Sequence, residues 1–228
     1  MNYLAHFSLA AGDDGLLVGA VLGDFVRGRS LEAYPAGVQR GIRLHRAVDA
    51  YSDAHPAARE SRRRISGPNR RYAGPIVDII YDHLLARDWS AYHPASLATF
   101  IGSAFAALHR HPLLFLPDAA GLIARMEADG WLEHLQERTG LAHALRRVGR
   151  RVRHPNTIEA AIDDFDRDPD GFAADFAACW PDLTAHCTVW LAQHGKGENP
   201  CPLFAEKGDT PSRSSFATSC SSARSHRG

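Results

Sequence analysis

Apolar residues recur every three or four positions along most of the chain, which is the spacing of amphipathic helices. The sequence has no runs of alternating apolar and polar residues between turn signals, so it predicts an all-α fold. Proline, glycine and capping residues, with Asn2 as the first N-cap, divide the pattern into helices. The predicted helices cover residues 2–10, 16–27, from Pro35 to about 52, 57–65, 72–88, 94–109, 117–131, a segment ending near 153, and 169–193, with an acidic turn at 163–169.

Three of the predicted helices place ionisable side chains on their apolar faces. His45 and Asp49 are four residues apart on one face, which they share with Val38 and Ile42. Burying such groups without partners is costly, so neighbouring helices must supply partners. The other ionisable residues at apolar faces are Asp24 in the second helix and Asp78, Asp82 and His83 in the fifth.

This pattern of acids and imidazoles favours a metal-dependent hydrolase. Carboxylates gathered in a low-dielectric interior repel one another, and a divalent cation is the simplest way to neutralise them. Imidazole and carboxylate ligands suit manganese, iron, zinc or magnesium. Such an ion acidifies water and stabilises charge on a phosphoryl oxygen. The sequence contains no nucleophile elbow, P-loop or dinucleotide fingerprint that would indicate another chemistry.

The charge balance and the distribution of apolar residues indicate which partners and which cellular location to expect. Lys+Arg and Asp+Glu both number 26, so no overall charge indicates a nucleic-acid or membrane partner. No segment reaches the roughly 18 apolar residues of a membrane span, and the N-terminus lacks a signal-peptide pattern, so we expect a cytoplasmic protein. The four cysteines lack Cys-x-x-Cys spacing, which predicts reduced thiols.

The composition changes near the C-terminus. From Gly195 onward the chain is rich in Gly, Pro, Ser and Arg, with few apolar residues to offset the entropy of ordering. We therefore expect one catalytic domain over residues 1–194 and a disordered tail over residues 195–228.

A strongly basic stretch follows the helix of His45. Such a stretch can be a solvated helix face without a specific function, or it can be a docking patch for an acidic partner. The arginines that would form this patch are Arg59, Arg62, Arg63 and Arg70.

Four segments, in this order, resemble the acyl carrier protein phosphodiesterases, also called acyl carrier protein hydrolyases. They are Asn2-Tyr-Leu-Ala-His6, Gly23-Asp24-Phe-Val-Arg27-Gly28, the stretch from Gly41 to Asp49 and the stretch from Pro75 to Trp89. The resemblance is specific over about residues 1–90, and looser to about residue 193. It implies a compact helical bundle distantly related to the HD-type metal-dependent phosphohydrolases.

The resemblance also implies a reaction and a partner. The reaction is cleavage of the phosphodiester between 4′-phosphopantetheine and a serine of holo acyl carrier protein, with manganese as the favoured metal. Carrier proteins are small, acidic helical domains, so the basic stretch would be their landing site.

Roles for individual residues follow from the same resemblance. Arg27 and Arg46 would offset charge on the phosphoryl oxygens, while Asp49 would bind the metal or orient a ligand, and Asp78 would support its helix face. The residues expected at the metal are Asp24, His45, Asp82 and His83, with His6 as a second choice.

Two other functions stay open at this point. The chain could be an HD-like hydrolase of a nucleotide or another small phosphate ester. It could also be a non-enzymatic helical module that binds an acidic protein, with its inner acids and imidazoles pairing with each other.

Overall fold

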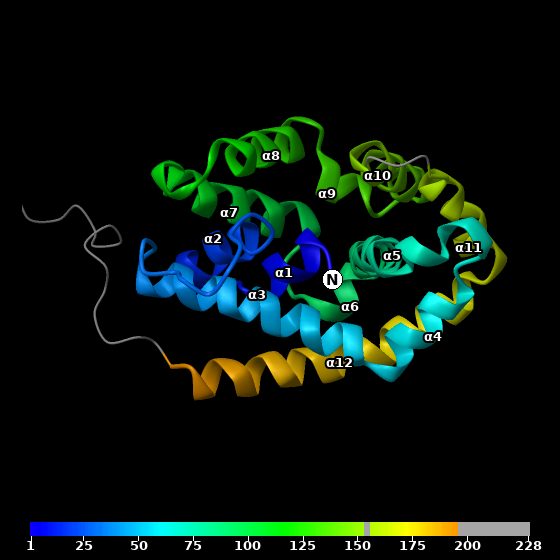
Figure 1. Cartoon of the computed structure of the whole chain (residues 1–228), viewed down its shortest axis with the longest axis horizontal. Helices are drawn as coiled ribbons and strands as arrows, with labels where there is room; N and C mark the ends of the chain where they lie inside the picture. Colours follow the sequence, from blue (N-terminus) through cyan, green and yellow to red (C-terminus); the bar gives the residue numbers. More distant parts are fainter. Residues whose placement is uncertain (153–155, 196–228) are drawn as a thin grey trace, which may run out of the picture.

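The computed structural model describes residues 1–152 and 156–195, and these residues form helices without strands (Figure 1). The predicted all-α fold is confirmed, whereas the relation to HD hydrolases stays a prediction. The α-helices are α1 (Tyr3–Leu9), α2 (Asp14–Leu22), α3 (Ala36–Ala54), α4 (Pro56–Arg64), α5 (Ala73–Arg87), α6 (Trp89–Tyr92), α7 (Leu97–His109), α8 (Pro117–Ala128), α9 (Trp131–His134), α10 (Arg138–Arg151), α11 (Ala161–Arg167) and α12 (Pro169–Gln193). The 3-10 helices are η1 (Gly67–Tyr72), η2 (Pro112–Leu114) and η3 (Ile158–Ala160).

Helices α2 and α3 approach each other through glycines spaced four residues apart. A Cβ atom at Gly15 would lie 2.8 Å from the carbonyl carbon of Gly37, and one at Gly19 would lie 2.5 Å from that of Gly41. Only hydrogen fits in these places, so the two backbones pack directly against each other. The next turn of α3 on the same face carries His45, and the glycine contacts therefore place this side chain close to α2.

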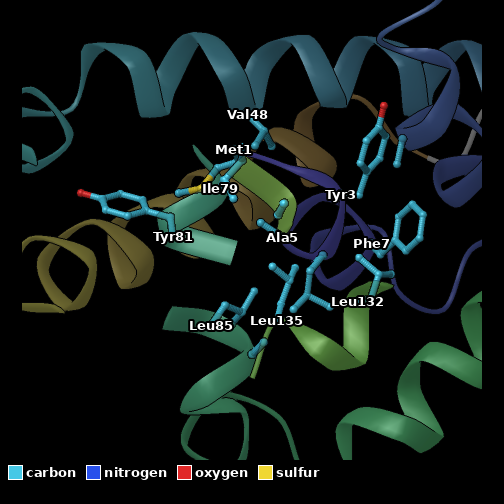
Figure 2. Close-up of a cluster of buried hydrophobic side chains, with 14 of the residues drawn as sticks. Met1, Tyr3, Ala5, Phe7, Val48, Ile79, Tyr81, Leu85, Leu132 and Leu135 are labelled. Atoms are coloured by element: carbon cyan, nitrogen blue, oxygen red, sulfur yellow. The ribbon is translucent and has the colours of Figure 1, made fainter. Parts of the chain in front are cut away.

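Helix α1 lies in the middle of the molecule and is almost wholly buried. Its Tyr3, Ala5 and Phe7 side chains belong to an apolar cluster to which α3, α5 and α9 also contribute (Figure 2). Burial on this scale is the main stabilising contribution to such a fold. It also means that any polar side chain on α1 is held in a fixed place.

The N-terminus of α1 is capped differently from the prediction. Asn2 occupies the N-cap position, but its side chain makes no capping hydrogen bond. Instead, the Asp82 carboxylate of α5 accepts hydrogen bonds from the backbone N–H groups of Leu4, at 2.8 Å, and Ala5, at 3.1 Å. A carboxylate satisfies N–H groups at a helix N-terminus and interacts favourably with the helix dipole. Asp82 therefore anchors α1 to α5.

Two predictions about the helices differ most from the structure. The second helix ends at Leu22 rather than at residue 27, because the chain turns at Gly23 and the Arg46 guanidinium then holds the Val26 and Gly28 carbonyls in a non-helical loop. The acidic segment predicted as a turn instead forms α11.

Helix α11 forms because its acids have partners and its apolar residues have a core. Phe165 is buried, and the buried Asp164 carboxylate accepts from the Ser66 backbone and from Arg167. Helix α12 begins at the predicted residue, with the Asp168 side chain as its N-cap, and it continues through Pro181.

The remaining expectations concern the chain as a whole. Among residues 1–152 and 156–195, no helix combines the length and hydrophobicity needed to cross a lipid bilayer. Cys179 and Cys187 are buried free thiols, whereas Cys201 and Cys220 lie outside the described residues. The predicted C-terminal tail lies outside the described residues except for Gly195, whose carbonyl accepts a hydrogen bond from Arg40.

Candidate metal centre

His6 of α1 meets His45 and Asp49 of α3 at the inner side of α3. The Nε2 atom of His6 lies 3.1 Å from Oδ1 of Asp49, and the Nε2 atom of His45 lies 3.2 Å from Oδ2. The two imidazole rings stack with their centroids 3.9 Å apart. One potential ligand atom from each of the three residues lies within 4.8 Å of the other two, so the group could hold a metal ion.

The orientation of His45 is set by α2. Its Nδ1 atom lies 2.9 Å from the Ala20 carbonyl, to which it donates, and its Nε2 atom therefore faces the carboxylates. The ring packs directly on Gly23, where a Cβ atom would overlap the imidazole. Gly23 has helical dihedral angles, φ −53° and ψ −35°, so this position requires the absence of a side chain rather than conformational freedom.

Asp24 lies beside these residues, in the turn after α2. Its Oδ1 atom is 3.5 Å from Nε2 of His45, and its side chain is 47% exposed. The Tyr3 hydroxyl, which points out of the apolar cluster (Figure 2), interacts with the same carboxylate and favours its ionised form. Asp24 therefore offers a carboxylate oxygen as a fourth ligand, or as a proton acceptor, at the solvent side of the group.

The two histidines differ in charge because their surroundings differ. Burial, together with the nearby charge of His45, lowers the pKa of His6 to about 4. Burial also disfavours the charged form of His45, but its hydrogen bonds to Asp24 and Asp49 raise its pKa to about 9. For Asp49, burial opposes ionisation, yet the two imidazoles hold its carboxyl pKa well below the usual range. Near neutral pH a proton on His45 thus occupies the position where a cation would bind, and metal binding would displace it.

The Met1 amino group is a further neighbour that the sequence did not indicate. It lies 3.1 Å from Oδ1 of Asp78 and 3.4 Å from Oδ1 of Asp49. Asp78 therefore pairs with this buried ammonium rather than with the histidines.

Asp82 and His83 were expected at the metal, but the structure does not bring them to the three-residue group. Asp82 caps α1, as described above. The His83 Nδ1 atom donates to the Leu135 carbonyl at 2.6 Å, and its ring lies edge-on to Phe165. Within the part of the chain that the structure describes, the only three-residue group with metal-ligand spacing is His6, His45 and Asp49.

The two arginines expected to offset phosphoryl charge both belong to or contact the loop that follows Asp24. Arg46 donates to the carbonyls of Val26, at 2.7 Å, and Gly28, at 2.8 Å, so it holds the loop that follows Asp24. Arg27 lies on this loop and is exposed.

The role of Asp82 predicts a pH-dependent stability. Burial raises the pKa of its carboxyl from 3.8 to about 7, and the two backbone N–H groups offset only part of this effect. A folded-state pKa above the unfolded value means that stability is lost as pH rises through about 7. We expect the free energy of unfolding of the metal-free protein, relative to an Asp82→Asn variant, to fall by about 1–3 kcal/mol between about pH 5 and about pH 8. Urea unfolding of both proteins measures this difference, and parallel pH profiles would contradict it.

The amino-acid sequence was compared with models of known protein families. The sequence model of the family described as acyl carrier protein phosphodiesterase matches residues 1–183. The chain belongs to this family. The match includes His6, Asp24, His45 and Asp49, and it ends within α12.

Curated relatives extend the comparison. A protein named acyl carrier protein phosphodiesterase from Photorhabdus laumondii is 34% identical over 183 residues, which cover 79% of this chain and 92% of the relative. Proteins of the same name from Salmonella paratyphi A and Enterobacter sp. (strain 638) are 32% and 30% identical over 186 residues each. They cover 81% and 79% of this chain and 96% and 94% of the relatives. No solved structure matches this member of the acyl carrier protein phosphodiesterase family.

Proposed function

We propose that this protein hydrolyses the phosphodiester that links 4′-phosphopantetheine to the serine of holo acyl carrier protein, with a divalent metal at His6, His45 and Asp49. The products are apo carrier protein and free 4′-phosphopantetheine. Membership of the family over residues 1–183 supports the reaction. The observation that carries the metal dependence is the convergence of three ligand atoms from α1 and α3 within 4.8 Å. The cytoplasmic location expected from the sequence is part of this proposal.

The chemistry of the ligand set favours a first-row divalent ion. Two imidazole nitrogens and a carboxylate suit manganese, iron or zinc, and Mn²⁺ is the proposed ion because a half-exposed carboxylate, Asp24, adds a further oxygen. A bound ion of this kind would polarise a phosphoryl oxygen and acidify water. The Nδ1–H of His45 is already committed to the Ala20 carbonyl, which leaves its Nε2 atom for the metal.

The chain's own residues would handle the proton and the charge. In the metal-free protein Asp24 is ionised, because its hydrogen bond to His45 outweighs the effect of burial and lowers its pKa. A cation at the same place would favour the ionised carboxylate as well. Asp24 can accept a proton from the attacking water and return it to the serine oxygen as that oxygen leaves phosphorus. The Tyr3 hydroxyl interacts with the Asp24 carboxylate, and Arg27, which is exposed and three residues after Asp24, is the cation that would offset phosphoryl charge.

Mass spectrometry of the carrier protein tests this proposal. The metal-free full-length chain is incubated with holo carrier protein after addition of Mn²⁺, Mg²⁺, Fe²⁺ or Zn²⁺, or of EDTA. We expect a mass loss of one phosphopantetheine with Mn²⁺ and none with EDTA. No mass change with any metal would overturn the proposal. A small phosphodiester hydrolysed as fast as holo carrier protein would favour the small-ester alternative instead.

A further inference from the structure

A strongly basic hollow lies between α8 and α10. Figure 1 shows these two helices in the upper part of the view, with α9 between them. The volume of the hollow is about 570 Å³. We call the surface around it the α10 face, and it is lined by Arg125 of α8, by Arg146, Arg147, Arg150 and Arg151 of α10, and by one acid, Asp129. A surface with so many like charges favours an anionic partner.

Several arginines of the α10 face remain available to a partner. Arg147 is paired with Asp129 and lies over the Trp131 ring, and Arg146 lies 3.3 Å from Glu159. For Arg125 and Arg150, both exposed, the structure gives no ion pair or hydrogen bond with any residue in 1–152 or 156–195. These two guanidinium groups can meet acidic side chains without first breaking an internal pair.

The basic stretch around α4, which the sequence indicated as the landing site, differs in this respect. Arg62 donates to both the side chain and the backbone carbonyl of Asp53, and Arg63 pairs with Glu60. Arg70 donates to the backbone of Arg63, while Arg59 is exposed. Arg62 and Arg63 would therefore have to leave acids of their own chain, and Arg70 a carbonyl, before they could meet an acidic partner.

The α10 face is also continuous with the candidate metal centre. A second hollow, of about 320 Å³, shares Arg125 and Arg151 with the first and is lined by Phe25, the residue after Asp24. Tyr3, whose hydroxyl interacts with Asp24, packs edge-on against Trp131 with ring centroids 6.2 Å apart. A protein bound at the α10 face would therefore lie beside the residues that could hold the metal.

We infer that the α10 face is the docking surface for the acidic helical body of the carrier protein, an inference that rests on the proposed function for the identity of the partner. Opposite charges steer the carrier to this face and orient it. Its serine-linked phosphodiester then enters the second hollow beside Asp24. The α4 stretch lies on the lower edge of Figure 1 with α12, away from this approach.

Binding of apo carrier protein, measured by calorimetry at low salt, tests docking separately from hydrolysis. We expect Arg125→Glu combined with Arg150→Glu to raise the dissociation constant at least about tenfold, and the difference to shrink as NaCl approaches about 0.5 M. Arg43→Glu on the exposed side of α3 is the matched control, and it should bind like the wild type. Arg59→Glu combined with Arg63→Glu tests the competing surface.

The outcomes separate the docking surface from the reaction. Unchanged binding by the Arg125/Arg150 variant, a loss confined to the Arg59/Arg63 variant, or no binding by the wild type would each overturn the α10 face. If the wild type binds as expected but never cleaves holo carrier protein, the docking surface stands and the proposed reaction falls. If cleavage occurs and the Arg125/Arg150 variant keeps the wild-type KM, the reaction stands and the docking surface falls.

Discussion

An Asp49→Asn variant is expected to lose hydrolysis of holo carrier protein by about 10³-fold or more while keeping its helices. Asp49 is the residue that both imidazoles contact, with Oδ1 at 3.1 Å from His6 and Oδ2 at 3.2 Å from His45. Asparagine has almost the same shape but cannot supply the negative charge that a cation needs. Losing one electrostatic contribution to a transition state typically costs on the order of 10²–10³ in rate, and here the metal would also be lost.

Metal-dependent stability distinguishes this loss from misfolding. Added Mn²⁺ should raise the melting temperature of the wild type, because a ligand of the folded state stabilises it, and should leave Asp49→Asn unchanged. Asp53→Asn, one turn further along α3 and 61% exposed, is the matched control and should behave like the wild type in both measurements. If the Asp49→Asn variant kept the wild-type kcat/KM, Asp49 could not be one of the residues that hold the metal.

A Gly23→Ala variant is expected to weaken Mn²⁺ binding by about 10–100-fold, although the change adds a single methyl group. The new Cβ atom would overlap the His45 ring, so the imidazole must leave its place between Ala20 and the carboxylates. Alanine fits the helical dihedral angles of this position, which means that the effect comes from contact with His45 and not from backbone strain.

Isothermal titration with Mn²⁺ measures this effect, and circular dichroism checks that the helices remain. The control is Gly102→Ala on the exposed side of α7, where a Cβ atom would meet nothing within 4 Å. That variant should bind Mn²⁺ like the wild type and be equally or slightly more stable. Wild-type affinity in Gly23→Ala would show that the ring does not need its present position.

The helices could be predicted because most of them have one buried face, and periodic apolar spacing reports a buried face directly. Helix ends were harder to predict where tertiary contacts determine them. Residues 23–27 continue a helical pattern, yet the hydrogen bonds from Arg46 hold this segment in another conformation. Asp163 and Asp164 resemble a polar turn until the Ser66 and Arg167 partners of Asp164 are known.

The candidate site also contains residues that could be placed from the sequence and residues that could not. The pair His45 and Asp49 could be predicted, because four-residue spacing on an apolar helix face depends only on local geometry. The position of Asp82 at the N-terminus of α1 could not be predicted, because a carboxylate on an apolar face looks the same whether it binds a metal or caps another helix. His6 lies on a helix of 7 residues, too short for periodicity to show which side chain points where.

One readable signal was missed. Glycines repeat at intervals of four residues at Gly15 and Gly19 on α2 and Gly23 at its C-cap, and again at Gly37 and Gly41 on α3. Such a repeat indicates a close helix crossing, and extending it by one turn on each helix pairs Gly23 with His45. The contact that orients the imidazole was therefore present in the sequence as a spacing of glycines.

Anomalous X-ray diffraction from crystals of the Mn²⁺-loaded protein tests the central claim most directly. We predict one strong manganese peak at coordination distance, about 2.0–2.3 Å, from Nε2 of His6, Nε2 of His45 and the Asp49 carboxylate. Asp24 should lie at its open side. A peak between Asp82 and His83, or crystals that bind no manganese while the protein in solution hydrolyses holo carrier protein, would contradict this account.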